Sequence, residues 1–443
     1  MAEWAKCQTK CQTKCQTKCQ TKCQVRGKNI STGTQDLKRV VVTGMAANTP
    51  LGATWEQFRA RVEEGRGGVV RMDEWDVYED LNTRLAAPIP TFDKPSHWTR
   101  KQTRSMSRVS FLATDAAERA LTDAGLLGDP FLQSGEVGVA FGSSTGSPEA
   151  ITDFGNMLTT HSLDGITATS YIRMMAHTTP INIGVFFGLK GRVLTTSSAC
   201  TSGSWGIGGA YEMIKYGKQT AMIAGGAEEL CPSEAAVFDT LYATSTQNET
   251  PDTSPRPFDV NRDGLVIGEG SAALVLEERQ RALARGARIY GEIIGFGTNS
   301  DGGHVTQPDT QTMGVAMQLA LQDADMPASR VDYVNAHGTA TDRGDIAESL
   351  AMQRIFGEGI ATSTLKGHIG HTLGACGAIE AWATLQMLAD GWFVPTNNLT
   401  DVDPQCGKVD YVMNAGRSLA AERVMSNNFA FGGINTSLLF APG

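Results

Sequence analysis

Among the nine cysteines of the chain, Cys200 stands apart by its surroundings. It lies in the segment SSACTSGS, between a short apolar run that predicts a strand and a segment that predicts a helix. The unpaired N–H groups and the positive dipole end of a helix start favour a thiolate, and the small neighbouring residues let a substrate approach closely. This setting predicts a nucleophile. On the local sequence alone, an ordinary buried core cysteine is the alternative.

Two histidines occupy positions that are typical of functional residues in α/β proteins. His337 follows the predicted strand VDYVNA and precedes Thr339 and Thr341, and sites of α/β folds assemble at strand ends. His371 lies in KGHIGHTLGACG, five residues after Lys366 and directly before a predicted helix. A cysteine with two imidazoles suits acyl transfer. The thiolate accepts an acyl group as a thioester, and neutral imidazoles donate hydrogen bonds to the carbonyl of a second thioester.

The other histidines lack such settings. We expect His368 to be exposed, and we expect surface or structural roles for the remaining four: His97, His161, His177 and His304.

A glycine pattern, GIGGA, raises the alternative of a dinucleotide-binding enzyme. Its glycines, Gly206, Gly208 and Gly209, lie inside the predicted helix after Cys200 and not in a strand-to-helix turn. No ribose-binding acid follows at suitable spacing. We therefore expect these glycines to allow close packing of the helix.

Five more cysteines belong to a repeat near the start of the chain, KCQTKCQTKCQTKCQTKCQ, and lie four residues apart: Cys7, Cys11, Cys15, Cys19 and Cys23. The repeat contains neither a glycine turn nor a histidine of the kind that encloses a zinc ion. We interpret residues 1–37 as a low-complexity extension, with a metal-binding tail as the alternative.

Composition narrows the class of protein. The 443 residues are 41% hydrophobic and 19% charged, which suits a globular protein with a large core, and the net charge of −9 gives no reason to expect nucleic acid as a partner. No run of about 18 apolar residues predicts a membrane span. The basic start lacks the apolar core of a secretory signal. Free thiols then indicate a reducing, cytoplasmic setting.

The elements that must position these residues alternate between strand and helix. The folded part is predicted to begin at Lys38, where KRVVVTG precedes an amphipathic helix. A second cycle of strand, glycine turn and helix starts near Gly291. The alternation predicts an α/β fold with mostly parallel sheets. It divides the chain into halves of residues 38–290 and 291–443.

Four motifs resemble those of the β-ketoacyl-acyl carrier protein synthases, the elongating condensing enzymes of thiolase-like fold. They are SSACTSGS, HGTATDRGDIAE, KGHIGHTLGACG and NNFAFGGIN, and GGAEELC and RPFDVNRDGLVIGEG support the resemblance. It extends from about Lys38 to Phe440. It implies two similar βαβαβαββ halves in a five-layered αβαβα core. It also implies a decarboxylative Claisen condensation that lengthens a fatty acid or polyketide-like chain by two carbons.

The resemblance also implies roles for individual residues. Cys200 matches the acylated nucleophile, and His337 and His371 match the pair that stabilises the enolate. The other matches are Lys366 near the second histidine, Asp345, Glu348 and Phe429 in a supporting network, Phe431 as a gate whose N–H completes an oxyanion hole with that of Cys200, Thr339 and Thr341 as hydroxyls that hold the substrate arm, and Thr145 in the acyl pocket.

No metal or other cofactor is implied, because the phosphopantetheine arm arrives on the acyl carrier protein with the acyl or malonyl thioester. A homodimer is implied, and a heterodimer with a related subunit is the alternative. A ketosynthase of secondary polyketide or polyene assembly is a second reading of the same motifs. A non-catalytic chain-length partner subunit is a third, although that class is expected to lack the nucleophile.

Three positions depart from the family pattern. Ala430 replaces a glycine of the gate, where we expect an alanine to stiffen the turn because it tolerates positive φ poorly. His368 stands where relatives carry an apolar residue. Thr145, of intermediate bulk, predicts a restricted acyl chain of short to medium length or of unusual, unsaturated type.

Overall fold

The computed structural model describes residues 37–443, so the cysteine repeat and its two interpretations lie outside the described residues. Eleven strands form one mixed sheet in the order β13-β11-β10-β15-β16-β9-β1-β8-β6-β4-β5. The bounds are β1 (Val40–Asn48), β4 (Val137–Gly142), β5 (Val193–Thr195), β6 (Ala221–Glu228), β8 (Gly270–Glu278), β9 (Gly291–Ser300), β10 (Tyr333–Asn335), β11 (Ala361–Ser363), β13 (Asp410–Tyr411), β15 (Val424–Ala430) and β16 (Ile434–Ala441).

Two small sheets lie beside it, one of β2 (Val70–Arg71), β3 (Leu85–Ala87) and β7 (Ile267–Gly268), the other of β12 (Trp392–Phe393) and β14 (Arg417–Ser418). The helices are α2 (Trp55–Glu63), α3 (Arg100–Thr103), α4 (Arg108–Asp123), α5 (Pro148–Thr160), α6 (Ser170–Met174), α7 (Thr178–Phe187), α8 (Ser202–Lys215), α9 (Pro232–Asp239), α10 (Arg279–Ala284), α11 (Thr310–Asp323), α12 (Asp342–Phe356), α13 (Lys366–Ile369) and α14 (Cys376–Asp390). Single 3-10 turns lie at 73–77, 130–133, 251–253, 328–330 and 373–375.

The large sheet consists of two repeats of one strand pattern. The first is β5-β4-β6-β8-β1 and the second is β11-β10-β15-β16-β9, in the same chain order and with the same relative directions. The eleventh strand, β13, adds to the outer edge of the second repeat beside β11. The repeats meet where residues 40–42 of β1 pair with residues 291–293 of β9. The predicted boundary at residues 290 and 291 falls between α10 and β9.

The prediction of mostly parallel sheets is wrong. In each repeat the outer three strands are parallel, whereas β8 and β16 run antiparallel to both of their neighbours. β15 returns directly into β16 through a tight turn of residues 431–433, whereas β6 and β8 are joined by a long connection that contains α9 and β7. Strand–helix alternation holds only for the parallel part of each repeat.

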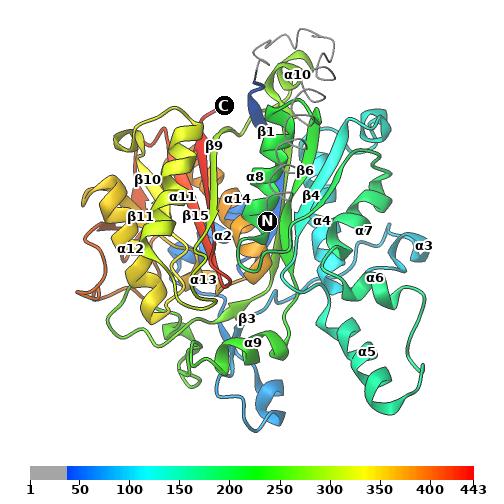
Figure 1. The fold of residues 1–443 in the computed structure, drawn as a ribbon, viewed down its shortest axis with the longest axis horizontal. Coiled ribbons are helices and arrows are strands. Elements are labelled where there is room, and N and C mark those ends of the chain that lie inside the picture. Colours follow the sequence, from blue (N-terminus) through cyan, green and yellow to red (C-terminus); the bar gives the residue numbers. More distant parts are fainter. Residues whose placement is uncertain (1–36) are drawn as a thin grey trace, which may run out of the picture. The chain divides into compact units, whose positions relative to one another are not determined.

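Helices cover both faces of the sheet and make five layers. α4 and α7 contact the strands of the first repeat on one side, and α11 contacts β9 and β16 of the second repeat with α12 packed beside it. α8 and α14 lie between the repeats, and each contacts strands of both (Figure 1). The central α8 can approach so closely because of its glycines. A Cβ on Gly208 would lie 2.3 Å from the ring of Phe296.

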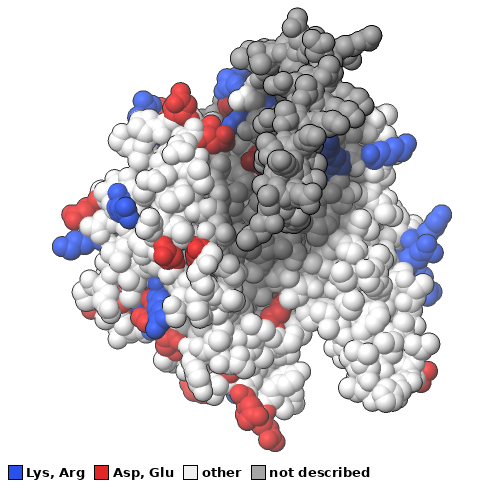
Figure 2. All heavy atoms as spheres, in the orientation of Figure 1, with Lys and Arg blue, Asp and Glu red and all other residues white. Residues whose placement is uncertain are grey.

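Charged side chains are scattered over the surface. On the face shown in Figure 2, outside the grey atoms, lysine and arginine lie along the upper right edge, aspartate and glutamate lie toward the bottom, and both signs are mixed on the left. Within the described residues, no helix is both long and apolar enough to span a membrane.

Candidate active site

A sharp turn between β5 and α8 presents Cys200. Ala199 adopts a left-handed conformation with φ of 50°. The hydroxyl of Ser202 holds the turn, since it accepts a hydrogen bond from the N–H of Ser198 and donates one to the carbonyl of Ala199. Cys200 is 4% exposed. As predicted, it lies between a strand end and a helix start.

The electrostatics of the thiol differ from the prediction. Burial raises the pKa of Cys200 to about 11, and the nearby Lys366 charge and the backbone N–H groups of Phe431 and Cys200 itself only partly oppose this shift. The expected thiolate is therefore not the resting form, because the cost of burying a charge exceeds the benefit of the helix start. Both N–H groups nevertheless point at the sulfur.

Two imidazoles face this sulfur from the second repeat. His337 follows β10, and His371 is fixed by backbone hydrogen bonds to Val266 and Gly268 beside β7. The ring centroids lie 5.1 Å apart at an interplanar angle of 87°. The sulfur of Cys200 and one nitrogen of each ring lie within 4.8 Å of one another. The structure thus brings together residues that are 137 and 34 positions apart in the chain.

Hydrogen bonds at Nδ1 define the tautomer of both rings. The ammonium of Lys366 donates to Nδ1 of His337 at 3.1 Å, and the backbone N–H of Leu373 donates to Nδ1 of His371 at 3.3 Å. Each neutral ring therefore carries its proton on Nε2. Burial, followed by the Lys366 charge, holds the pKa of both histidines well below the usual range. Both rings are neutral hydrogen-bond donors at physiological pH.

A buried ion pair positions Lys366. Its ammonium contacts the Glu380 carboxylate, both side chains are 1% exposed, and Asn428 donates to the second Glu380 oxygen at 2.6 Å. Although burial opposes it, the Glu380 charge raises the pKa of Lys366. The thiol of Cys376 donates to the carbonyl of Cys200 at 3.1 Å.

Sequence reasoning did not identify Glu380, Asn428 or Cys376 as part of the site. Cys376 and Glu380 are four residues apart on α14, hence on one face of a helix that begins just after His371. That spacing was the available signal. Asn428 stands in the motif NNFAFGGIN, and that motif was the signal for it.

Asp345 and Glu348 hold the His337 loop through its backbone. Asp345 accepts hydrogen bonds from the N–H groups of Thr339 and residues 340 and 258, and Glu348 accepts from those of His337 and residue 338. Burial raises the pKa of Asp345 to about 6 and that of Glu348 to about 8. The hydroxyls of Thr339 and Thr341 lie 2.9 Å apart.

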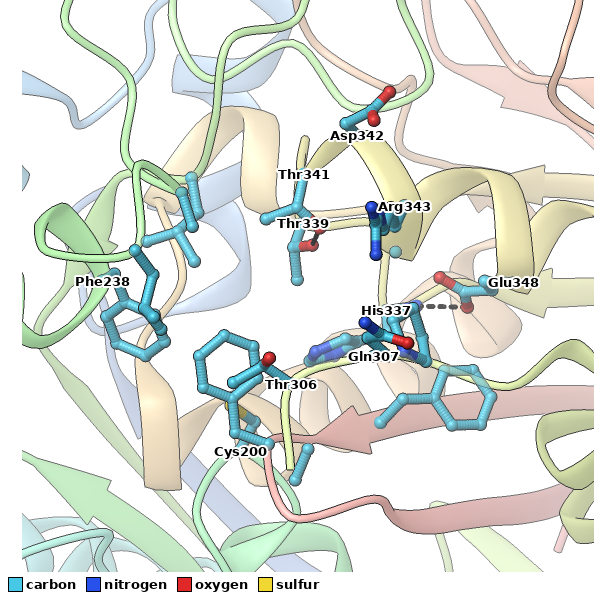
Figure 3. A pocket seen from close by; sticks show the side chains of 18 of the residues that line it. Cys200, Phe238, Thr306, Gln307, His337, Thr339, Thr341, Asp342, Arg343 and Glu348 are labelled. Atoms are coloured by element: carbon cyan, nitrogen blue, oxygen red, sulfur yellow. Dashed lines mark hydrogen bonds between the residues drawn. The ribbon is translucent and has the colours of Figure 1, made fainter. Parts of the chain in front are cut away.

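One cavity of about 510 Å³ joins these groups. Its lining includes Cys200, His337, His371, Thr339, Thr341, Glu348 and Phe429. Figure 3 shows Thr339 and Thr341 across the cavity from Cys200, and Glu348 beside His337. Phe431 also lines the cavity and packs on Phe238 with ring centroids 5.2 Å apart. The predicted nucleophile, imidazoles, hydroxyls and gate therefore share one space.

The cavity does not include Thr145. Its side chain is exposed in the single chain and donates to the Glu234 carboxyl at 3.2 Å. The premise that Ala430 must take a positive φ is wrong. Ala430 ends β15 in extended conformation, whereas Gly432 and Gly433 take the positive φ values of 90° and 70°.

His368 is not exposed as predicted. It is 2% exposed, and its Nε2 lies 2.8 Å from the carbonyl oxygen of Pro395. The short helix α13 turns this side chain inward, toward the segment after β12. The glycines of GIGGA lie inside α8, as predicted, and not in a strand-to-helix turn.

Two groups of side chains have the donor atoms of a metal site. One is Cys200 with His337 and His371, and the other is His337 with Cys376 and Glu380. In the second group the Lys366 ammonium already contacts both His337 and Glu380, so a cation occupies that position. The first group is open to the cavity and suits a soft divalent cation as well as a thioester.

Comparisons with known proteins agree with this geometry. Residues 37–282 match the family model of the β-ketoacyl synthase N-terminal domain, and residues 290–400 match that of the C-terminal domain. The 3-oxoacyl-[acyl-carrier-protein] synthase 2 of Synechocystis sp. is 37% identical over 91% of this chain and 98% of its own length. The 3-oxoacyl-[acyl-carrier-protein] synthase 1 of Escherichia coli is 35% identical over 91% and 98%.

Solved structures are similar as well. A β-ketoacyl synthase from Burkholderia phymatum superposes with a TM-score of 0.91 at 58% identity, over 92% of this chain and all of the other. The ishigamide ketosynthase/chain length factor gives 0.83 at 28% identity, over 92% of this chain and all of the other. The motifs, the two-repeat fold and these matches together show that the chain belongs to the β-ketoacyl-acyl carrier protein synthase family.

Proposed function

We propose that this protein condenses a Cys200-bound acyl group with a malonyl thioester and so lengthens the acyl chain by two carbons. The observation that carries the proposal is the meeting of one sulfur and one nitrogen of each of two imidazoles within 4.8 Å in an open cavity, with both rings in the Nε2–H tautomer. A nucleophile and two neutral donors on either side of one reacting carbonyl are what this chemistry requires.

In the first step the sulfur of Cys200 attacks the thioester of an acyl carrier protein. The backbone N–H groups of Cys200 and Phe431 point at the sulfur, so they are placed to receive the oxyanion that forms beside it. The carrier thiolate leaves and takes the proton that Cys200 loses. The products are an acyl-cysteine and a free carrier thiol.

In the second step a malonyl thioester enters the same cavity. Its thioester carbonyl accepts hydrogen bonds from Nε2–H of His337 and of His371, which stabilise the enolate as carbon dioxide leaves. The enolate carbon attacks the acyl-cysteine, and the Cys200 thiolate departs and is reprotonated. Lys366 holds His337 in the donating tautomer.

The scheme needs no metal or redox cofactor, because the phosphopantetheine arm belongs to the carrier. We assign Thr339 and Thr341 to that arm, since both hydroxyls line the cavity. Thr145 lies outside the cavity of the single chain, so we assign it to an acyl pocket that only the proposed dimer completes, with short to medium or unsaturated acyl groups as expected substrates. We place the reaction in the cytoplasm, where the unpaired cysteines of the described chain are compatible with a reducing environment.

A homodimer is the proposed assembly. The strand β5 forms one edge of the large sheet. Val193 in this strand is 45% exposed, and Val185 on the neighbouring α7 is 73% exposed. An edge strand with exposed apolar neighbours favours pairing with a second copy. The ishigamide ketosynthase/chain length factor makes a heterodimer with a related subunit the alternative.

The same site also fits a ketosynthase of polyketide assembly. A type II polyketide ketosynthase in complex with its acyl carrier protein is 29% identical, with a TM-score of 0.82. A purely non-catalytic partner subunit does not fit, because nucleophile and both imidazoles are present.

The test is to incubate the purified protein with malonyl-carrier and a panel of acyl-carriers of increasing length, and to identify the products by mass spectrometry. A single two-carbon extension supports fatty acid elongation, and repeated unreduced extensions support the polyketide alternative. If Cys200→Ala still accepts radiolabelled acyl groups at the wild-type level, the assignment of the nucleophile is wrong. A clear preference for long saturated chains would exclude the proposed role of Thr145.

A further inference from the structure

One arginine of the cavity wall has no partner in the part of the chain that the structure describes. Arg343 lies in the first turn of α12 and lines the cavity (Figure 3). Within residues 37–443, its side chain makes no hydrogen bond and no ion pair. The other arginine of the lining, Arg262, is held by Asp403 at 2.6 Å and by Asp342 at 3.4 Å. Arg343 is therefore the cation in this wall that is free to bind something else.

Arg343 continues a polar path that begins near the sulfur. Along the wall, Thr339 is 9% exposed, Thr341 is half-buried and Arg343 is exposed. Figure 3 shows these three side chains on one side of the cavity, with Gln307 facing them from another segment. The Gln307 side chain has no hydrogen-bond partner among the described residues. Polar groups thus follow one another from the buried inner end to solvent.

The acidic groups of the same lining are already engaged. Asp263 accepts a hydrogen bond from the N–H of residue 246, Asp301 accepts from Asn435, and Glu348 is held by two backbone N–H groups. Asp342 contacts Arg262 and is 80% exposed. None of these carboxylates compensates the guanidinium of Arg343, so its natural counterpart is an anion that enters with the substrate.

We propose that Arg343, assisted by the Gln307 amide, binds the phosphodiester group of the phosphopantetheine arm. The inference rests on the proposed function, because that function brings the arm into this cavity. With the thioester at Cys200 and the arm amides near the threonine hydroxyls, the phosphate is the group at the outer end. A guanidinium offers a planar pair of donors that matches two phosphate oxygens.

The experiment compares binding of two unreactive ligands that differ only in the anion. One is the amide analogue of malonyl-phosphopantetheine with its phosphate capped as a methyl phosphodiester, and the other is the same molecule without the methyl phosphate. Both are titrated calorimetrically into the wild type, Arg343→Gln and Arg343→Lys. Arg330→Gln is the matched control, because Arg330 is an exposed arginine that does not line the cavity.

We expect the wild type to bind the phosphorylated analogue about three- to tenfold more tightly, the range for an exposed charge-assisted contact. Arg343→Gln should lose this preference, Arg343→Lys should keep part of it, and Arg330→Gln should keep all of it. A wild type without preference, or a preference that survives in Arg343→Gln, overturns the assignment. Since no turnover is needed, the outcome is independent of whether condensation occurs.

A carboxylate of the carrier protein is the other anion that Arg343 could meet. Kinetics with malonyl-carrier and free malonyl-phosphopantetheine separate the two sources. If the phosphate is bound, Arg343→Gln raises KM for both substrates with kcat unchanged. A rise confined to malonyl-carrier would assign Arg343 to the carrier surface and refute the phosphodiester assignment.

Discussion

Replacing Lys366 by methionine should damage stability and catalysis by separate routes. The substitution keeps most of the side-chain volume but removes the ammonium from a pair in which each side chain is 1% exposed. Removing one partner of a buried ion pair leaves the other charge uncompensated, which costs about 3–5 kcal/mol of unfolding free energy. His337 also loses the donor that fixes its tautomer. A hydrogen bond from a charged group contributes about 1.5–3 kcal/mol, which corresponds to a rate loss of about 10- to 150-fold.

The double variant Lys366→Met/Glu380→Gln separates the two effects. Neutralising Glu380 removes the uncompensated charge, so urea denaturation should show most of the stability restored. The rate of malonyl decarboxylation should stay low, because no ammonium faces Nδ1 of His337. Recovery of the wild-type rate in the double variant would refute the tautomer argument. A single variant as stable as the wild type would refute the argument from the buried charge.

Three further predictions concern the sulfur, the imidazoles and the central helix. Cys200→Ala should lose condensation but keep decarboxylating malonyl thioesters, at a rate that is flat between about pH 7.5 and 6. The neutral imidazoles of His337 and His371 are lost only as the pH falls through their depressed pKa values, so a midpoint near 6.5 would contradict this. The rate at which iodoacetamide alkylates Cys200, measured by peptide mass spectrometry, should rise about tenfold per pH unit from about pH 7 to 10, because the pKa of the thiol is about 11. A rate that reaches a plateau near pH 8.5 would indicate an unperturbed thiol. Gly208→Ala should lower the unfolding free energy by about 1–3 kcal/mol, because the added Cβ would lie 2.3 Å from the Phe296 ring. An unchanged midpoint of urea denaturation would show that α8 can shift to accommodate the methyl group.

The parts of the site that lie at the ends of elements could be predicted from the sequence. Cys200, His337 and His371 each stand where a periodic segment gives way to small or glycine-rich residues, and such transitions are local features. The pKa of Cys200 could not be predicted in this way, because the helix start is visible in the sequence while the depth of burial depends on segments hundreds of residues away.

The remaining errors have the same origin. His368 carries a polar side chain next to glycines, a pattern that fits an exposed loop, yet its environment is set by residues around Pro395. The direction of β8 and β16 depends on which strands they meet and not on their own composition. Glu380 would be an ordinary helical glutamate except that Lys366 reaches it across the interior.

The seam between the two repeats has a consequence for how the protein could be assembled from pieces. The thiol comes from the first repeat and both rings from the second, and the backbone joins them only once, between α10 and β9. Each fragment of a chain cut there would hold an incomplete set of reacting groups, so neither would condense anything alone. Mixing the two fragments would restore condensation only to the extent that β1 and β9 pair again. The condensation rate would therefore measure the fraction of fragments that have associated.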